Sequence, residues 1–489
     1  MHETDRQYRQ RLIDAIERQS DLEDMLLIRG YFPEPTIIPP FVAPLREGIS
    51  GDGITREPIT LFAPKGANGW RDFSLLHPNN YLKVVKTICN LLPTMVSIWQ
   101  APQRIISFSI PQAFDRQIER PEQQIIQWVE MQSRIFANAQ ELNYSCIFQA
   151  DIQQCYHVMY THVIEWVLES SGARNPQELD IAVRRGNRNR THGLPVGPAA
   201  TDYVAETVLC HIDCEIEKDL EERGIVDYCA FRFKDNYYFL SASPDDLDEI
   251  QRLISLRLRY WHLTLNEKKS KRELVSVYLS DRWQNKYESV VSILDKHASS
   301  VVPLPTLQAF IGNLLALSAS YDHEKAIIQK ALKRLVGIRP TKHSDYRQYF
   351  LLIASLIEAR NALPGILAVL RILYQEDTSQ LKDTYNRFLT TQIKSAHSKK
   401  EINSLLWLSY ITADNDEGEM IKLICGALND YMEDPLAKTA RDYIQYVQSG
   451  EVPRDSILWD SPASLRFIFQ SHKPPRKLYD DISKVFAES

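Results

Sequence analysis

The sequence predicts an α+β region followed by an all-α region. Residues 144–152 (YSCIFQADI) and 226–240 (VDYCAFRFKDNYYFL) are rich in aromatic and β-branched residues, which favours strands. The second segment has a polar break at residues 234–236, which is typical of a β-hairpin. After about residue 285 the apolar positions follow helical periodicity only. We therefore expect an antiparallel sheet with helices, followed by a helical-repeat-like array.

The composition is that of a folded protein with two or three domains. The chain has 489 residues, 44% of them hydrophobic and 25% charged, and its 17 glycines and 25 prolines disfavour collagen-like and disordered classes. The longest apolar stretches, such as the one interrupted by Pro364 and Arg371, are shorter than the roughly 20 residues that span a bilayer. The charged N-terminus is unlike a secretory signal. We expect no membrane crossing and a cytoplasmic location.

The charge and the cysteines limit the classes of site. A formal net charge of −6 does not indicate nucleic-acid binding, so such a function would require a local basic patch. Seven cysteines lie mostly among apolar neighbours, which fits reduced, buried thiols. Cys210 and Cys214 are one helical turn apart, and a metal site can be imagined there. No second ligand pair follows at zinc spacing, so we predict core thiols.

The first 140 residues contain helices and two irregular segments. Residues 4–29 have the pattern of one or two amphipathic helices. Residues 30–41 contain four prolines and are expected to form an extended strap. Five glycines gather in residues 48–69, which predicts a loop or a loose hairpin. Helical periodicity resumes at residues 80–92 and 122–140.

Three short segments hold the residues with chemical potential, and each alone has an ordinary explanation. Residues 148–156 (FQADIQQCY) are a strand that ends in Asp151, and an aspartate there is usually a cap or turn residue. Residues 191–198 (THGLPVGP) are a turn before a helical run at 199–220. Residues 231–238 (FRFKDNYY) contain a Lys-Asp-Asn hairpin loop.

Taken together in this order, the segments resemble the palm of reverse transcriptases. In that family an aspartate is followed five residues later by an aromatic, as Asp151 is by Tyr156. A Leu-Pro-x-Gly turn follows, here ending in Pro195, Val196 and Gly197. The third motif is an aromatic, any residue, then two aspartates, where this chain has Asp235 and Asn236, and residues 263–270 (LTLNEKKS) match the fourth.

The resemblance implies a catalytic site for two-metal phosphoryl transfer. Asp151 and Asp235 would be the catalytic carboxylates and, with Asn236, would hold Mg²⁺, or Mn²⁺ as an alternative. Tyr156 would lie beneath the incoming sugar, where its bulk opposes a 2′-hydroxyl, so dNTPs are the implied substrates. The turn with Pro195 and Gly197 would contact the nucleotide. Lys269 would lie near the triphosphate.

Two departures from the family pattern bear on activity. Asn236 replaces the second aspartate, which removes one negative charge and should weaken ion binding. Val196 stands where templated reverse transcriptases commonly have glutamine, which disfavours templated synthesis. The acidic pair in residues 243–246 (SPDD) is predicted to be a capped helix start rather than the third motif.

The flanks of these motifs resemble the abortive-infection (Abi) polymerases of phage defence, in their prophage-borne form. They are residues 157–162 (HVMYTH), Glu165-Trp166, the Thr-His before Gly193, and residues 210–213 (CHID). Arg71, with Pro78 and Tyr81, resembles the fingers of that group. The resemblance implies N-terminal helices and a strap at 1–45, fingers at 46–140, a palm at 141–285 and a C-terminal α-helical domain at 286–489.

The same resemblance implies template-independent DNA synthesis that starts on a tyrosine of the protein, within a homo-oligomer. The single-stranded DNA product would then stay covalently attached. We take Tyr8 as the candidate priming residue because it lies in a charged N-terminal segment, although a helix-surface tyrosine is the ordinary explanation. Tyr31 and Phe32 are expected to be packed anchors.

A run of arginines lies just before the Leu-Pro-x-Gly turn. Such a run is usually a solvated loop, but beside a nucleotide site arginine forks suit phosphate oxygens. The candidate DNA-phosphate contacts are therefore Arg184, Arg185, Arg188 and Arg190. The histidines near the motifs (157, 162, 192 and 211) are predicted to be hydrogen-bonded structural residues rather than a zinc site.

The function predicted from the sequence is a Mg²⁺-dependent, protein-primed DNA nucleotidyltransferase in antiphage defence. Two alternatives stay open at this point. One is a templated reverse transcriptase, and the other is an inactive palm that binds nucleic acid or a partner. Asn236 supports the second alternative.

Overall fold

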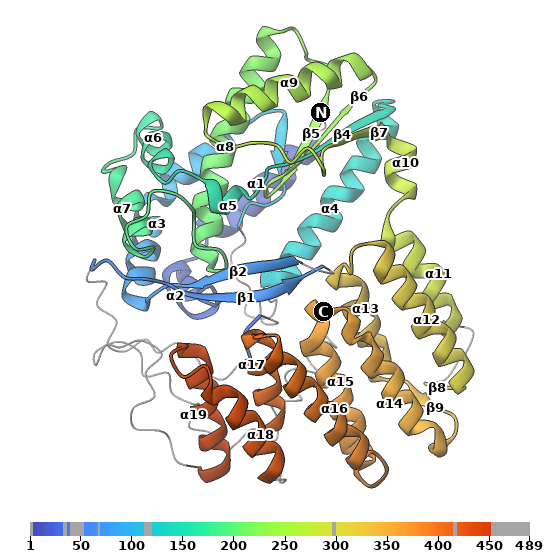
Figure 1. Ribbon diagram of the computed structural model, residues 1–489. Helices are drawn as coiled ribbons and strands as arrows, with labels where there is room; N and C mark the ends of the chain where they lie inside the picture. The colour runs from blue at the N-terminus through green and yellow to red at the C-terminus, as the bar shows by residue number, and fades with distance from the viewer. Residues whose placement is uncertain are drawn as a thin grey trace. The chain divides into compact units, whose positions relative to one another are not determined.

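The chain divides into two compact units (Figure 1). The computed structural model describes residues 3–32, 37–39, 53–66, 69–111, 120–295, 300–413 and 418–450. The first unit comprises Met1–Glu34, Gly48–Thr60 and Phe73–Asp281, and the second comprises Pro35–Glu47, Leu61–Asp72 and Arg282–Ser489. The boundaries expected at 45, 140 and 285 stay predictions.

A five-stranded sheet forms the centre of the first unit. Its order is β3-β5-β6-β4-β7, with β3 (Ile105–Ser107) parallel to β5 (Cys229–Phe233) and the other neighbours antiparallel. β4 (Cys146–Asp151) lies between β6 (Asn236–Ser241) and β7 (Lys271–Leu274). The buried residues of β4, β5 and β6 form near-continuous runs, which is typical of strands that are covered on both faces.

The hairpin predicted at residues 226–240 is confirmed. β5 and β6 are joined by Lys234 and Asp235, and Lys234 has a φ of 53°. Such a two-residue turn keeps the twist of antiparallel strands. The register pairs Asp151 at the end of β4 with Asn236 at the start of β6. The end of one predicted strand therefore lies beside the tip of the predicted hairpin.

Helices cover both faces of the sheet. On one face, α4 (Arg120–Glu141) and α10 (Val275–Ser280) pack on a core that includes Ile147, Phe231 and Leu240. On the other side, α9 (Pro244–Tyr260) contacts β4 and β6, and α8 (Ala199–Glu222) contacts β3. Ser243 caps α9 by accepting from the Asp246 N–H at 3.1 Å, as expected for a capped helix start.

α3 (Pro78–Gln100) and α6 (His162–Ser170) pack against α8, and α7 (Gln177–Arg185) packs against α3 and α6. The short helix α5 (Cys155–Val158) lies between β4 and α6 in the chain. α3 contacts both α7 and α8, and it continues through Pro93 well beyond the helix expected at residues 80–92. A proline removes one main-chain hydrogen bond, and the long buried face of α3 outweighs that loss.

The N-terminal segment forms two helices, α1 (Glu3–Glu17) and α2 (Leu22–Arg29), within the range predicted at residues 4–29. Tyr31 is buried and its hydroxyl donates to the Leu76 carbonyl at 2.6 Å, so it is the packed anchor expected. Half of the predicted proline-rich strap, residues 33–36 and 40–41, lies outside the described residues. β1 (Ile59–Lys65) pairs with β2 (Gly69–Leu75), and part of the hairpin expected at 48–69 is thus present.

The second unit contains most of the β1–β2 hairpin, and its described residues from Arg282 onward are almost entirely helical, as the sequence predicts. It has two-residue parallel strands, β8 (Val301–Val302) and β9 (Arg339–Pro340), which helical periodicity does not reveal. The helices in its described part are α11 (Trp283–Asp295), α12 (Leu304–Ser320), α13 (Lys325–Val336), α14 (Tyr346–Ser355), α15 (Leu363–Glu376), α16 (Thr378–Ser398), α17 (Ile402–Thr412), α18 (Gly418–Asn429) and α19 (Pro435–Ser449).

The predicted fold class is therefore confirmed. The chain has an α+β unit with a largely antiparallel sheet, compatible with a reverse-transcriptase-like palm, and an all-α C-terminal region. Among the described residues no single helix is long and apolar enough to cross a membrane. Two consecutive helical segments, His343–Glu358 and Arg360–Glu376, are long and apolar enough only when taken together, and the chain bends by 117° between them.

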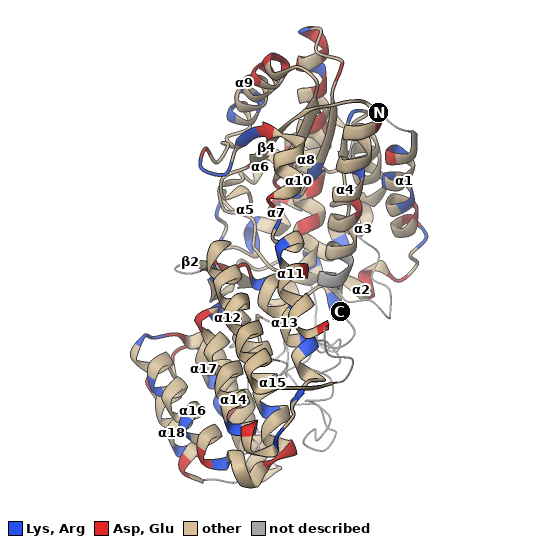
Figure 2. Cartoon of the chain, turned by 90° about the vertical axis from the view of Figure 1, so that its right-hand side faces the viewer, with Lys and Arg blue, Asp and Glu red and all other residues tan. Residues whose placement is uncertain are grey.

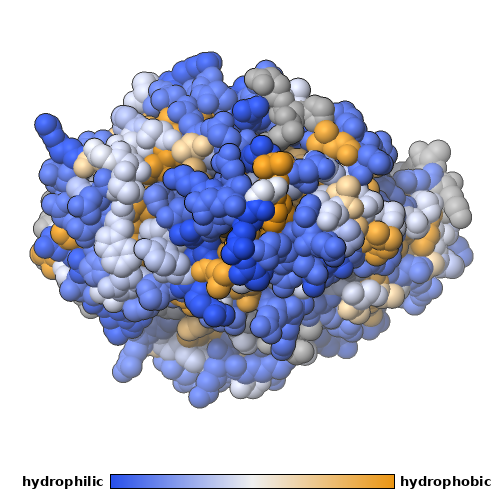
Figure 3. All heavy atoms as spheres, turned by 90° about the horizontal axis from the view of Figure 1, so that it is seen from above, coloured by the Kyte–Doolittle hydropathy of each residue, from blue (hydrophilic) through white to orange (hydrophobic). Residues whose placement is uncertain are grey.

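Charged residues are distributed over many helices. Figure 2 shows both signs of charge interspersed along α1 and α9. The face seen from above, over α9, is mainly hydrophilic with scattered hydrophobic residues (Figure 3). The charge that matters for function must therefore be sought in local groups of residues.

Candidate functional site

Two carboxylates meet where β4 and the β5–β6 hairpin end. Asp151 is the last residue of β4 and lies opposite Asn236 in the register, and Asp235 precedes Asn236 at the hairpin tip. The Ile152 N–H donates to the Asp235 carbonyl at 2.9 Å, which ties the two strand ends together. The structure thus brings Asp151, Asp235 and Asn236 to one place.

The Asp235 carboxyl lies in an environment that disfavours its charge. Burial, and then the negative charge of Asp151, raise its pKa above the ordinary value. Lys234 and Lys269 oppose this effect but do not cancel it. A buried carboxylate pair with excess negative charge is an environment in which a cation is stabilised.

Asp151 has a donor on each carboxylate oxygen. The Asn266 side-chain amide donates to Oδ1 at 3.1 Å, and the Lys269 ammonium lies 3.0 Å from Oδ2. The Asn266 N–H also donates to the Asp151 carbonyl at 2.7 Å. Asp151 is only 7% exposed, whereas 56% of the Lys269 side chain is exposed. Lys269 therefore reaches from solvent to the buried carboxylate.

Asn236 faces the neighbouring carboxylate. Its side-chain amide donates to Asp235 Oδ1 at 3.0 Å. An aspartate at this position would place a third negative charge beside two others, whereas the amide supplies a donor. The departure from the family pattern therefore has a local structural role in this chain.

Tyr156 lies beside the carboxylates and is held in place by a hydrogen bond. It is on α5, and its hydroxyl donates to Asp202 Oδ1 at 2.8 Å. The Lys234 ammonium lies 3.9 Å from the other Asp202 oxygen. Burial, and then the Asp202 carboxylate, raise the pKa of Tyr156 well above its ordinary value. The ring is therefore a fixed neutral surface.

The turn between residues 193 and 197 packs against the same region. The Leu194 N–H donates to the Tyr156 carbonyl at 2.6 Å, and the Gly193 N–H donates to the Met159 carbonyl at 2.9 Å. Gly193 has a φ of +87°, and a Cβ there would lie 3.0 Å from the His157 carbonyl oxygen, so glycine is required. Gly197, with a φ of 120°, follows the buried Pro195.

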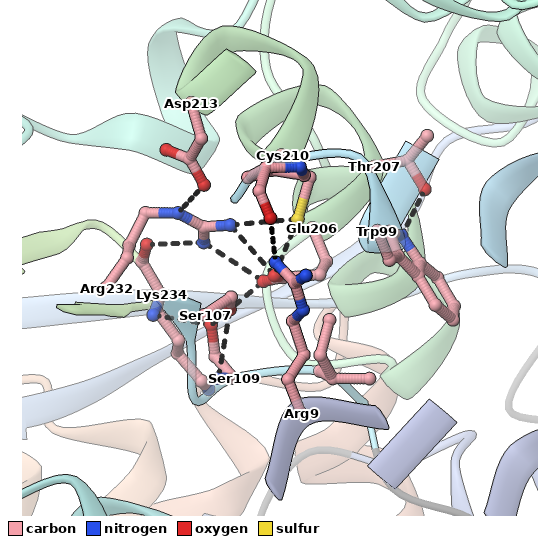
Figure 4. A network of polar contacts seen from close by, with 12 residues as sticks. Arg9, Trp99, Ser107, Ser109, Glu206, Thr207, Cys210, Asp213, Arg232 and Lys234 are labelled. Atoms are coloured by element: carbon pink, nitrogen blue, oxygen red, sulfur yellow. Dashed lines mark hydrogen bonds and ion pairs between the residues drawn. The ribbon is translucent and has the colours of Figure 1, made fainter. Parts of the chain in front are cut away.

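A buried ion network supports the hairpin from within (Figure 4). Arg232, in the middle of β5, is fully buried and donates to Glu206 and Asp213 of α8 at 2.8 Å each. It also donates to the Lys234 carbonyl at 3.1 Å, next to Asp235. Tyr237 donates to Asp213 at 2.8 Å. This network fixes the hairpin to α8 from both of its strands.

Two carboxylates share one guanidinium in this network. Burial lowers the pKa of Arg232, but Asp213 and Glu206 raise it well above the ordinary value, so the guanidinium stays charged. Burial raises the pKa of Glu206, yet Arg232 lowers it overall. Burial raises the pKa of Asp213 to about 6 although Arg232 opposes it. Arg232 and Glu206 form the charged pair, and Asp213 is the carboxyl that protonates more readily.

Two contacts tie the C-terminal end of α3 to its neighbours. Arg9 of α1 donates to the carbonyls of Pro102 and Gln100 at 2.6 and 3.1 Å. Trp99 of α3 donates from Nε1 to Thr207 Oγ1 of α8 at 3.0 Å (Figure 4). The end of α3 is therefore linked both to α1 and to the helix that carries the network carboxylates.

The arginine run divides into engaged and exposed members. Arg184 donates to both Asp180 oxygens at 3.0 and 3.1 Å, and Arg188 forms an ion pair with Glu57. Arg185 and Arg190 are exposed. As phosphate contacts, all four stay predictions, with Arg184 and Arg188 already neutralised by carboxylates.

Two other predicted site residues, Arg71 and Tyr8, lie on β2 and on α1. Arg71 is exposed on β2 and belongs to the second unit. Tyr8 of α1 is stacked on Phe108, with ring centroids 4.9 Å apart. Burial, and then the charge of Glu130, raise the pKa of Tyr8 to about 12. Tyr8 is thus a packed residue whose hydroxyl holds its proton tightly, and its priming role stays a prediction.

The cysteines and histidines near the motifs have structural partners. Cys210 is buried, and its thiol lies 3.2 Å from both Glu206 and Arg232. Among the described residues, the one group with metal-ligand geometry is His162, Glu165 and Asp180. His162 Nδ1 already lies 2.9 Å from Asp180, which Arg184 also holds. This group is accounted for as an ion-pair cluster.

Sequence patterns did not single out the buried network or the role of Asn266. A signal for the network was present, because Asp202, Glu206 and Asp213 recur at helical spacing in a segment that is otherwise apolar. Arg232 is likewise flanked by apolar residues in its strand. Buried charges of opposite sign on two elements point to a pair, but only the fold identifies the partners.

The site contains carboxylate oxygens that can bind a divalent cation, the neutral ring of Tyr156, and two lysines. Carboxylate oxygens of Asp151 and Asp235 are the ligands preferred by Mg²⁺. Lys269 and Lys234 can neutralise phosphate charge. These groups fit phosphoryl transfer better than nucleophilic or redox chemistry.

Comparisons with known proteins give only distant likenesses. No protein-family model matches the chain, and no curated protein matches its sequence. The structure of apo telomerase from Candida tropicalis aligns with a TM-score of 0.35 and 9% identity over 82% of this chain and 71% of that chain. The structure of the same telomerase with a fragment of telomeric RNA aligns with a TM-score of 0.31 and 11% identity over 82% of this chain and 65% of that chain.

Telomerase from Candida albicans, also with a fragment of telomeric RNA, aligns with a TM-score of 0.32 and 10% identity, over 71% of this chain and 66% of that chain. The chain spans about two thirds of the length of these telomerase chains. The fold assignment rests on the sheet and its helices.

Proposed function

We propose that the protein is a template-independent, protein-primed DNA nucleotidyltransferase that acts in abortive-infection defence against phage. The observation that carries this proposal is the pairing of Asp151 with the hairpin tip that bears Asp235. Four sequence motifs in palm order support it. Phosphoryl transfer requires positioning and charge neutralisation, and these residues supply both.

The residues present fit a divalent metal cofactor. Asp151 and Asp235 lie on adjacent strand ends, and burial, and then the charge of Asp151, raise the pKa of Asp235, so a cation bound between the two carboxylates would be favoured. Mg²⁺, or Mn²⁺ in its place, would activate the attacking hydroxyl and stabilise charge on the transferred phosphoryl group. Asn236 would contribute its amide oxygen if the side chain turned away from Asp235.

The other residues of the site would bind and orient the nucleotide. Lys269, whose side chain is 56% exposed, would exchange its contact with Asp151 for a triphosphate oxygen. Tyr156, fixed by Asp202, would present a rigid ring beneath the sugar and exclude a 2′-hydroxyl. The turn with Gly193 and Gly197 would bring main chain against the nucleotide. Substrates are therefore dNTPs.

The proposal includes the start of DNA synthesis on a tyrosine hydroxyl of the protein itself. A tyrosine hydroxyl, with an ordinary pKa of about 10, gives up its proton more readily than a sugar hydroxyl. Tyr8 is the candidate, although its packing requires α1 to move before the hydroxyl can react. A homo-oligomer and a cytoplasmic location belong to the same proposal and rest on the family resemblance.

The direct experiment is incubation of the purified protein with Mg²⁺ and labelled dNTPs, without template. We expect labelled polymer that stays with the protein through denaturing electrophoresis and is released by protease. Peptide mapping of the adduct identifies the primer, and Tyr8→Phe tests Tyr8 directly. Polymer that forms only when RNA template is added would replace this function by templated reverse transcription.

A second candidate, an inactive palm that binds nucleic acid or a partner, is favoured by one observation. Donors from Asn236, Asn266 and Lys269 already occupy carboxylate oxygens of the site. Under this alternative no metal-dependent incorporation of dNTPs would occur with or without template. Recovery of incorporation in Asn236→Asp would show that loss of the second aspartate inactivated the site.

A further inference from the structure

Rings from four segments gather at one edge of the first unit, and the site described above does not use them. Tyr160 lies at the centre, with ring centroids 5.7 Å from Trp166, 5.1 Å from His192 and 6.1 Å from His262. Trp166 and Tyr260 both flank the buried Trp261, at 6.5 and 5.5 Å. We call Tyr160, Trp166, His192, Tyr260 and His262 the aromatic platform.

The platform is open to solvent. Trp166 is 45% exposed and Tyr260 is 69% exposed, while His192 and His262 are exposed as well. A single exposed aromatic side chain is ordinary, whereas several that gather in one place are typical of a binding surface. The exposed rings are linked through the part-buried Tyr160 and the buried Trp261, and each offers a face on which a planar group can stack.

The main chain connects the platform to the carboxylate site. Four residues after His262, the Asn266 N–H donates to the Asp151 carbonyl at 2.7 Å. The Gln153 N–H donates to the Thr264 carbonyl at 2.8 Å, and Tyr160 pairs with His192 in an isolated β-bridge. The segment that follows His262 is therefore bonded to the strand end that bears Asp151.

A groove with an excess of positive charge lies next to the platform. It runs along the outer face of α9 and is lined by Arg252, Arg259 and Arg272, with one carboxylate, Asp248, and the neutral Gln251, Ser255 and Leu256. Arg272 pairs with Asp248, and Arg252 pairs with Glu249. Arg259 directly precedes Tyr260, so one arginine of the groove is the chain neighbour of one ring of the platform.

Acidic residues near the platform are largely engaged. Glu215 accepts from Trp261 Nε1 at 2.5 Å and lies 3.5 Å from Arg257, while Asp219 also pairs with Arg257. Arg257 lies 5.7 Å from the Tyr260 ring centroid. The repulsion that these carboxylates would exert on a polyanion is therefore reduced.

We propose that the aromatic platform and the arginine groove bind single-stranded DNA, with bases stacked on the rings and phosphates along the groove. Binding of this kind tolerates any sequence because every base has a stacking face. The ligand follows from the proposed function, in which single-stranded DNA is the product. A platform beside the site would hold the growing strand close to the carboxylates without a template.

The test is fluorescence anisotropy of a labelled oligo(dT) with the full chain, in EDTA and without dNTPs. We expect Trp166→Ala and Tyr260→Ala each to raise the Kd about tenfold, because one stacked base is lost. Trp166→Phe should restore most of the affinity because it keeps a ring. Arg259→Gln should reduce the slope of log Kd against log salt concentration by about one.

Phe136→Ala is the matched control, because Phe136 is an exposed aromatic on α4 and lies outside the platform. Its Kd should equal that of the wild type. Wild-type affinity in both Trp166→Ala and Tyr260→Ala, or equal weakening in Phe136→Ala, would overturn the proposal. Binding of an RNA oligomer but not of oligo(dT) would also overturn it.

The result is separable from the proposed function. Platform-dependent binding by a protein that incorporates no dNTP would leave this inference standing and refute the polymerase. DNA synthesis by the wild type, together with normal oligo(dT) binding by the platform variants, would support the polymerase and refute this inference.

Discussion

Two groups of charges in the first unit lie close together and are organised in opposite ways. In the network of Arg232, Glu206 and Asp213, every group is buried and hydrogen-bonded to another member. At the tip of the same hairpin, Asp151 and Asp235 are paired with the largely exposed Lys269 and with amides. The charges of the network are thus buried and paired with one another, whereas the carboxylate site includes a partner, Lys269, whose side chain is largely exposed.

The contrast separates charges that hold the fold from charges that are available for chemistry. Breaking a buried pair leaves an uncompensated charge, which is costly, so Arg232 is expected to act on stability. The contact of Lys269 with Asp151 is partly exposed and worth little to stability. Its replacement by a metal ion or a triphosphate therefore meets little resistance.

The largest expected effect is on stability, from Arg232→Met. The change leaves Glu206 and Asp213 buried without their guanidinium, which should cost about 3–5 kcal/mol in the free energy of unfolding. Chemical denaturation measures this loss. Arg18→Met is the control, because the Arg18 side chain is 81% exposed and pairs with Asp14 within α1, so its loss should cost at most about 1 kcal/mol. Equal losses in both variants would remove the distinction between the two groups of charges.

The next effect is a pH dependence in the network. The pKa of Asp213 is about 6 in the folded protein against an ordinary 3.8, so its contribution to stability is complete below pH 3.8 and is lost as pH rises through about 6. By 1.36 kcal/mol per pKa unit this is at most about 3 kcal/mol.

Asp213→Asn does not titrate. Denaturation curves at a series of pH values should therefore show the wild type losing stability relative to Asp213→Asn as pH rises from about 4 to about 7. A constant difference between the two proteins would show that Asp213 stays ionised throughout and that Arg232 neutralises both carboxylates.

A smaller effect is expected on turnover, from Lys269→Met. Loss of the cation that would bind the triphosphate should slow dNTP incorporation about tenfold or more, which corresponds to about 1.4 kcal/mol of transition-state stabilisation. The melting temperature should change little because the lysine is mostly exposed. Full activity in this variant would exclude Lys269 from the nucleotide site.

The smallest effect is expected from Asn236→Asp. In EDTA the added charge beside Asp235 and the lost amide donor should reduce stability by about 1 kcal/mol. Mg²⁺ should reverse this loss, because a ligand that binds the folded state stabilises it. Thermal melts with and without Mg²⁺ measure both changes, and a variant that Mg²⁺ does not stabilise would argue against a metal at this position.

The sequence predicted the elements better than the contacts among them. Strands β4, β5 and β6 and the helix α8 follow from local patterns of residues, which the chain carries within each segment. The proximity of Asp151 and Asp235 was also predictable, because a strand end and a two-residue hairpin tip in one sheet have few arrangements.

The pairing of Arg232 with α8 was not predictable in the same way. It depends on how α8 packs against the sheet, which no local pattern specifies. The ring cluster around Tyr160 is a similar case, since its members come from segments about a hundred residues apart. Local propensity depends on residues that are close in sequence, so it does not predict which distant residues meet. Tertiary packing brings these residues together.

The central claim is that Asp151 and Asp235 form the metal site of a nucleotidyltransferase. The most direct measurement is Mg²⁺-dependent, template-free incorporation of labelled dNTPs by Asp151→Asn, compared with Asp246→Asn at the start of α9. We predict that Asp151→Asn loses about a thousandfold in rate, about 4 kcal/mol, while it keeps the wild-type melting temperature, and that Asp246→Asn stays fully active. Full activity in Asp151→Asn would contradict the claim.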